Sequence, residues 1–189
     1  HAEHLSPGGD NLSLVTQYLF RHHRKVFDDI LARMARRVPG VTKVEAQDTI
    51  DGRVVLRFQD GAFKDPFVAR YVSDGTIKMF AYLVLLSDPD PHPLLSIEEP
   101  ENQLYPTLLY ELVDEFRLYS RRGGQVMVST HSPDLLNWAK LDELYWLEKR
   151  DGFTTVHRAS ESAQLRNLIH EGDNLGNLWT QGLLGDANP

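Results

Sequence analysis

The stretch that decides the fold runs from Leu94 to Pro106 and reads Leu94-Leu-Ser-Ile-Glu-Glu-Pro-Glu-Asn-Gln-Leu-Tyr-Pro106. Its first four residues are mostly apolar, which predicts a short buried strand, and Pro100 ends that strand. Glu98 and Glu99 therefore project from its carboxyl end. Ligands of open α/β sheets bind beyond the carboxyl ends of the strands. Two carboxylates at such an edge suit a phosphate-bound magnesium ion and the positioning of an attacking water.

A strand that ends in acids can also simply lead into a solvated loop. The segments on either side are needed to distinguish such a loop from a ligand site. Upstream, Ser73-Asp-Gly-Thr76 opens a run that is apolar nearly all round, which predicts a buried helix. Ser73 suits the N-cap of that helix, and Gly75 lets a ligand approach the backbone closely. Free N–H groups and the helix dipole favour an anion there. An ordinary helix cap of the same composition is the alternative.

Downstream, the segment Gln125-Val-Met-Val-Ser-Thr-His-Ser-Pro133 predicts a buried strand that runs into a polar turn. This turn presents His131, whose imidazole can hydrogen-bond a terminal phosphate or an attacking water. A histidine that only satisfies its own turn is the alternative.

In this order, the three segments resemble an ATP-binding-cassette (ABC) ATPase. Ser73 to Thr76 looks like the signature motif, and Leu94 to Glu99 looks like the Walker B strand with its following catalytic glutamate. Pro100 to Pro106 looks like the D-loop, and His131 looks like the switch histidine. The closest variant is the soluble, non-transporter branch of RecF-like, chromosome-maintenance (SMC) and overcoming-lysogenization-defect ATPases, with bacterial AAA-family proteins of unknown or antiphage role. The motifs share the order and spacing of that family, which makes the resemblance specific.

The resemblance implies a role for each residue of the strand ends. Glu98, where the family usually has aspartate, would hold Mg²⁺ through water. Glu99 would orient or deprotonate the attacking water, and His131 would hold that water and the γ-phosphate of ATP.

The resemblance also implies a dimer that closes on ATP. Ser73 and the Gly75 N–H would clamp the γ-phosphate of a nucleotide bound to the opposite subunit. Glu101 and Asn102, in the segment that looks like the D-loop, would lie at the dimer contact. The signature departs from the common transporter form at two positions, because Asp74 and Thr76 replace its glycine and glutamine.

The phosphate-binding Walker A loop, Gly-x-x-x-x-Gly-Lys followed by Ser or Thr, is missing from the chain. None of the 13 glycines is followed by lysine. The chain, which starts at His1 without a methionine or a signal-peptide pattern, is therefore expected to be the C-terminal half of a nucleotide-binding domain. We expect it to bind ATP poorly alone and to need an N-terminal Walker A half. A non-catalytic interaction half-domain, docked on a partner or on that N-terminal half, is the alternative.

The missing half has a consequence for the sheet. In the resembling family, the strand that carries the phosphate loop lies beside the strand that leads to the switch histidine. The Gln125 to Ser129 strand is therefore expected to need a neighbouring strand from another segment or chain.

The predicted fold class is α/β: the C-terminal portion of a P-loop NTPase of the ABC type, with a mainly parallel sheet flanked by helices. We expect residues 1–71 to form a helical and antiparallel-β subdomain. Residues 72–158 should hold the signature, Walker B and switch portion, and residues 159–189 a helical tail. Within the first region, helices to Arg21 and Val38 precede an antiparallel hairpin that turns near Asp51-Gly52.

Composition narrows the function classes. The 189 residues are 41% apolar, which supports a core, and no stretch approaches the ~18 apolar residues of a membrane span. Cysteine is absent, which excludes disulfides and fits the predicted cytoplasmic location. The net charge of −7 argues against a broad nucleic-acid surface, although DNA or an effector protein stays a candidate partner.

Two groups of basic residues are interpreted as surface features rather than as binding sites. Arg33, Arg36 and Arg37 are expected to form a solvated helix end. His1 and His4 have no acid at metal-ligand spacing, so they are expected to be exposed histidines without a metal.

Overall fold

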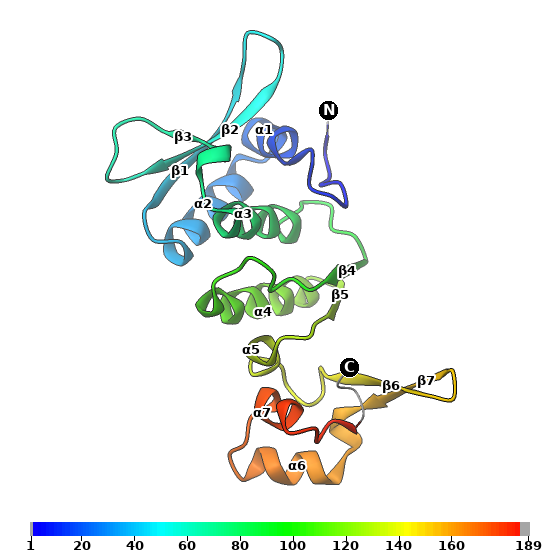
Figure 1. Ribbon diagram of the computed structural model, residues 1–189. Helices are drawn as coiled ribbons and strands as arrows, with labels where there is room; N and C mark the ends of the chain where they lie inside the picture. Colours follow the sequence, from blue (N-terminus) through cyan, green and yellow to red (C-terminus); the bar gives the residue numbers. More distant parts are fainter. Residues whose placement is uncertain (1, 186–189) are drawn as a thin grey trace. The chain divides into compact units, whose positions relative to one another are not determined.

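The computed structural model describes residues 2–185. They form, in chain order, α1 (Leu12–His22), α2 (Arg24–Arg37), β1 (Val41–Asp48), β2 (Val54–Asp60), β3 (Phe67–Val68), η1 (Ala69–Tyr71), α3 (Asp74–Leu86), β4 (Leu94–Glu98), α4 (Pro106–Arg121), β5 (Gln125–Ser129), α5 (Pro133–Leu136), β6 (Tyr145–Arg150), β7 (Phe153–Arg158), η2 (Ala159–Glu161), α6 (Ala163–His170) and α7 (Leu175–Thr180) (Figure 1). None of the helices in this part of the chain is long and apolar enough to cross a bilayer.

The chain divides into two compact units. Unit 1 contains residues 1–96 and 102–127, and unit 2 contains residues 97–101 and 128–189. Strands β4 and β5 therefore each begin in unit 1 and end in unit 2. The predicted boundaries at residues 71 and 158 stay a prediction.

The first half of unit 1 is a helix pair on an antiparallel sheet. β1 pairs with β2 from Val41 opposite Asp60 to Asp48 opposite Val54, as the Asp51-Gly52 turn predicts. β3 adds a third strand on the other side of β2. Helices α1 and α2 pack against β1, and α2 also packs on α3. The buried side chains of this core include Leu19, Phe27, Ile30, Met34, Val44, Phe58 and Phe80.

Helices α2 and α4 of unit 1 are joined by a buried ion-pair network. Glu115 of α4 is 1% exposed, and its carboxylate lies 2.6 Å from both Arg33 and Arg37 of α2. The expectation of a solvated helix end is therefore wrong for these two arginines, whose side chains are 13% and 9% exposed. Arg36 is exposed, as expected. The arginines lie on the face of α2 that meets Glu115 of α4, which local sequence does not reveal.

β4 and β5 form a two-stranded parallel sheet. The prediction that both strands are buried is wrong, because Leu95 is the only buried residue in either strand. The N–H of Gln125 donates to the Pro93 carbonyl at 2.9 Å at one end, and the N–H of Glu99 donates to the Ser129 carbonyl at 2.8 Å at the other. Both carboxyl ends therefore lie at the same edge. Among residues 2–185, β5 has β4 as its only strand neighbour, and Met127 in its middle is 55% exposed. The neighbour expected on its other side stays a prediction.

Unit 2 continues from β5 into a small helical and hairpin layer. β6 and β7 pair antiparallel, from Tyr145 opposite Arg158 to Arg150 opposite Phe153. Its core holds Ala159, Leu165, Leu178 and Leu184, against which Trp146 and Trp179 pack. Gly176 of α7 lies so close to α5 that an added Cβ would be 2.2 Å from the Pro133 carbonyl oxygen. The tail helices follow the predicted pattern, although α7 ends at Thr180 rather than near Leu184.

Candidate functional site

The predicted strand end carries its two glutamates as expected. Glu98 is the last residue of β4 and is exposed, and Glu99 follows it. The φ angle of Glu99 is +41°. This is a left-handed backbone conformation that residues other than Gly, Asn and Asp rarely adopt. Its N–H is held by the carbonyl of Ser129, the last residue of β5. The turn therefore fixes the backbone of Glu99 against the neighbouring strand in a conformation that costs free energy.

The structure brings His131 to the same strand ends. The Nε2 atom of His131 lies 3.7 Å from the Oε1 atom of Glu99. The turn after β5 is fixed from both sides, because the Thr130 hydroxyl accepts from the Ser132 N–H at 3.0 Å. Ser132 in turn caps α5 by accepting from the Leu135 N–H at 3.2 Å. The side chains of His131 and Glu99 are 69% and 43% exposed, so solvent and a ligand can reach both.

Glu101 is held at the same turn through a residue that the sequence analysis did not single out. The Thr130 hydroxyl donates to Glu101 Oε1 at 2.5 Å. Within the described part of the chain, the other carboxylate oxygen of Glu101 is buried and has no hydrogen-bond partner. In the sequence, the only indication of this role of Thr130 is its position directly before the candidate switch histidine. An unsatisfied buried oxygen is a feature that functional sites share.

The segment that resembles the signature lies in unit 1. Ser73 is the N-cap of α3, and its hydroxyl accepts from the Thr76 N–H at 3.3 Å. This contact is the ordinary helix cap that was the alternative interpretation, and it leaves the exposed Ser73 available for a second role.

Gly75 is needed by the chain itself. An added Cβ would lie 2.6 Å from the Gln103 carbonyl oxygen. Beside it, Lys78 Nζ donates to the Asn102 carbonyl at 2.7 Å. The start of α3 is thus docked on the predicted D-loop segment at Asn102 and Gln103, within unit 1.

Metal-donor side chains gather elsewhere in the molecule. Among residues 2–185, the only group of at least three such side chains is His4, Asp88 and His92. Glu98, Glu99 and Glu101 do not form one. The expectation that His4 lacks an acidic partner is wrong, because Asp88 lies 2.7 Å from its ring, whereas His1 lies outside the described residues.

Chemically, unit 2 presents a carboxylate and an imidazole side by side at the ends of two parallel strands. Both side chains can hydrogen-bond water, and at 3.7 Å one water can contact both groups. This arrangement suits the activation of a water at the carboxyl edge of a sheet.

Comparison with known proteins supplies the family and the fold. The family model described as "AAA domain, putative AbiEii toxin, Type IV TA system" matches residues 7–137, which is more than half of the chain. This range contains every residue assigned above to the signature, Walker B, D-loop and switch motifs. A search of the curated proteins finds no significant match.

Among solved structures, the chain is similar to ATPase heads of SMC proteins. A structure from work on ATP-driven dimerization and DNA-stimulated activation of SMC ATPases has a TM-score of 0.57 at 16% identity, over 84% of this chain and 99% of that one. An Smc head bound to the C-winged helix domain of ScpA gives 0.58 at 18% identity, over 81% and 47%. The Pyrococcus furiosus Smc head bound to the C-terminal domain of ScpA gives 0.59 at 14% identity, over 82% and 40%.

The chain thus spans nearly all of the first of these structures and less than half of the other two. At these identities the likeness shows the fold, which is the P-loop NTPase fold of ABC-type ATPase heads in the SMC and RecF-like branch. The α/β fold class predicted from the sequence is confirmed. By the match over residues 7–137, the chain belongs to the family described as "AAA domain, putative AbiEii toxin, Type IV TA system".

Proposed function

We propose that this chain is one half of an ABC-type ATPase that binds and hydrolyses ATP. This half carries the strand ends at which hydrolysis takes place. The observation that carries the proposal is the placement of Glu99 beside His131 at the carboxyl ends of β4 and β5. Glu99 orients the attacking water and accepts its proton, and His131 holds the same water and the terminal phosphate. Membership in an AAA-domain family supports nucleotide chemistry at this edge.

The residues present fit a magnesium ion that is held mostly by other ligands. Mg²⁺ prefers oxygen donors and commonly keeps several waters, with one or two carboxylates and the substrate phosphates. Glu98 supplies an exposed carboxylate at the end of β4, and it would hold the ion through water. When bound, the ion neutralises charge on the transferred phosphoryl group.

The proposed active form is a dimer of ATPase heads. Ser73 and the Gly75 N–H, at the start of α3, would contact the γ-phosphate held by the opposite subunit, as the resemblance implies. Asn102 and Glu101 would lie at the dimer contact. Support comes from the docking of α3 on the Asn102–Gln103 segment, because this docking places the start of α3 beside the segment proposed for the dimer contact.

The proposed function needs a Walker A half. The open side of β5 is where the resembling family places the strand that carries the phosphate loop, and a bare strand edge is a template for such pairing. The N-terminal half would therefore complete both the sheet and the nucleotide site.

The biological setting is also part of the proposal. The family description names a toxin of a type IV toxin–antitoxin system, which favours an antiphage or other defence role in the cytoplasm. One structural relative was studied for DNA-stimulated activation, so DNA, or an effector protein, is a candidate partner of the assembled ATPase.

The alternative is a half-domain that docks on a partner without catalysis. The absence of a glycine followed by lysine favours it for the chain taken by itself.

ATP hydrolysis by the chain, by the Walker A half and by an equimolar mixture decides between the two functions. We expect turnover only in the mixture, and micromolar ATP binding in calorimetry only there as well. A mixture that forms a stable complex but hydrolyses no ATP would favour the docking half-domain. Tight ATP binding by the chain alone would contradict the need for a Walker A half.

A further inference from the structure

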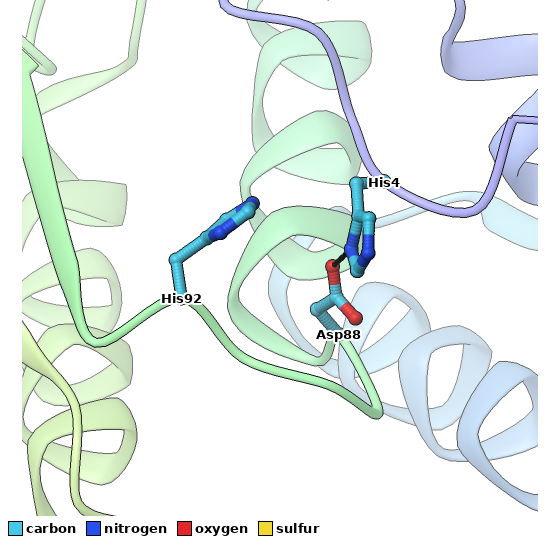
Figure 2. A group of neighbouring side chains, drawn as sticks. All are labelled: His4, Asp88 and His92. Carbon is cyan, nitrogen blue, oxygen red and sulfur yellow. Dashed lines mark hydrogen bonds and ion pairs between the residues drawn. The ribbon is translucent and has the colours of Figure 1, made fainter.

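His4, Asp88 and His92 come from two segments that lie far apart in the sequence but side by side in unit 1. His4 precedes α1, whereas Asp88 and His92 lie in the loop between α3 and β4 (Figure 2). The Nδ1 atom of His4 is 2.7 Å from Asp88 Oδ2, and the rings of His4 and His92 are 5.1 Å apart. One donor atom from each side chain lies within 4.8 Å of the other two.

The carboxylate at the centre of this group is held in place. The Asp88 side chain is 8% exposed, and its Oδ1 atom accepts from the Asp90 N–H at 2.9 Å. Its Oδ2 atom faces His4. Asp88 is therefore a buried anion with a fixed direction, and burying an anion is costly unless a positive partner compensates it.

The backbone that carries His92 is fixed as well. The loop reads Asp88-Pro-Asp-Pro-His-Pro93, and its prolines restrict the main chain. The Tyr119 hydroxyl donates to the His92 carbonyl, and the Gln125 N–H donates to the Pro93 carbonyl at 2.9 Å. Only the exposed imidazole of His92 remains free to adjust.

We propose that His4, Asp88 and His92 form a binding site for a divalent transition-metal ion of the zinc type. Two imidazole nitrogens with one carboxylate oxygen are a donor set that Zn²⁺ accepts and that Mg²⁺ does not favour. The carboxylates of Glu3 and Asp90 lie close enough to His4 to add negative potential. No residue of this site takes part in the proposed ATP chemistry.

The geometry needs only a small adjustment to hold the ion. Tetrahedral Zn²⁺ with bonds of about 2.0–2.2 Å places its ligand atoms about 3.3 Å apart. The donor atoms here lie within 4.8 Å of one another, so a movement of about 1.5 Å closes the site, and rotation of the His92 side chain supplies it. The ion takes the place of the proton that His4 and Asp88 share, and a water completes the coordination.

The bound ion has a structural role. It joins the segment before α1 to the loop that leads into β4, which is the strand that ends at Glu98. In the described residues, these segments are linked by the hydrogen bond between His4 and Asp88 and by the ring contact between His4 and His92, whereas a metal would give three bonds with fixed geometry. The site therefore holds the loop before β4 against the segment before α1.

The test is a zinc titration of the full 189-residue chain, free of any histidine tag and stripped with a chelator. Competition against a chromophoric chelator should show one tight Zn²⁺ per chain, unaffected by excess Mg²⁺. His92→Ala is the main variant because this side chain is exposed. It should weaken binding at least tenfold, since even outer partners of metal ligands typically change affinity about 10–100-fold. His4→Ala should do the same.

Two control variants remove exposed histidines elsewhere: His22→Ala and His170→Ala. Both should bind zinc as the wild type does. Zinc should also raise the melting temperature of the wild type and of both controls but not of His92→Ala, whose circular dichroism shows whether it is folded. Wild-type binding no tighter than that of folded His92→Ala would overturn the proposal. An equal loss in either control would overturn it too.

Discussion

The Nε2 atom of His131 lies 3.7 Å from the Oε1 atom of Glu99, although the two residues follow different strands. Parallel pairing is the cause, because it places the carboxyl ends of β4 and β5 at one edge, and the Glu99 N–H is tied to the Ser129 carbonyl there. The pair is too far apart for a direct hydrogen bond and close enough to share a water.

Glu99→Gln should remove ATP turnover by the complex with the Walker A half while leaving ATP binding intact. The amide keeps the shape of the side chain but cannot accept the proton of the attacking water, so kcat should fall about 10²–10⁴-fold. Phosphate release and calorimetric ATP affinity measure the two effects separately. Glu171→Gln, an exposed acid at the end of α6, is the control and should behave as the wild type.

If Glu99 and His131 act on one water, the losses of transition-state stabilisation caused by the two substitutions will not add. The double variant with His131→Ala should be about as slow as the slower single variant. Losses that multiply would mean that the two residues act independently, and wild-type turnover in Glu99→Gln would show that Glu99 is not the base.

Ser73→Arg should abolish ATP-dependent dimerisation and leave the nucleotide affinity of each subunit nearly unchanged. The added side chain would occupy the place proposed for the partner's γ-phosphate. Because Ser73 also caps α3, loss of the cap should lower stability by ~1 kcal/mol as well. Ser73→Asn, which keeps a capping side chain, should unfold like the wild type and still impair dimerisation. Dimers of unchanged yield on a sizing column with ATP would contradict the assignment of the signature.

Glu115→Gln should lower the free energy of unfolding by about 3–5 kcal/mol, because it removes the buried carboxylate that pairs with both Arg33 and Arg37 and leaves them with partly exposed acidic partners. Urea unfolding followed by circular dichroism measures the change. Glu111→Gln is a matched control on the same helix, since Glu111 also pairs with Arg37 but its side chain is 38% exposed. That variant should lose no more than about 1 kcal/mol. Equal losses in both variants would show that burial of Glu115 is unimportant.

The His4–Asp88 pair should make stability depend on pH. The hydrogen bond that the His4 ring donates to Asp88, together with the charge of Asp88, raises the pKa of His4 above the ordinary value of 6.5. A raised pKa in the folded state stabilises the protein fully below pH 6.5, and this contribution is lost as the pH rises through the folded pKa. With a chelator present, His4→Ala should therefore cost more stability in acid than in base. A difference from the wild type that is constant with pH would exclude this linkage.

The sequence was sufficient for the features that depend on neighbouring residues. The strand before Glu98, the helix cap at Ser73 and the hairpin turn at Asp51-Gly52 are all local patterns, and the structure contains each of them. The burial predicted for that strand is wrong, because burial depends on distant segments and only Leu95 of β4 is buried. The resemblance implied that Glu99 and His131 act on one water, and the two side chains lie 3.7 Å apart in the structure.

Features that depend on distant segments could not be predicted in this way. Arg33 and Arg37 have an ordinary helix-end pattern until α4 brings Glu115 to them. His4 acquires its acid from the other end of α3. The need for glycine at position 75 comes from the Gln103 carbonyl, so its physical cause differed from the one that the sequence suggested.

The backbone of Glu99 has a φ angle of +41°, where a residue other than glycine pays roughly 1–2 kcal/mol. Glycine or asparagine would relieve that strain, yet either would remove the carboxylate from the strand end. Selection for thermal robustness and selection for turnover would therefore pull this one position in opposite directions. Under the proposed function, a related chain that does not hydrolyse ATP would be free to carry the less strained residue. Under the proposed function, the residue at position 99 in related chains therefore indicates which of them hydrolyse ATP.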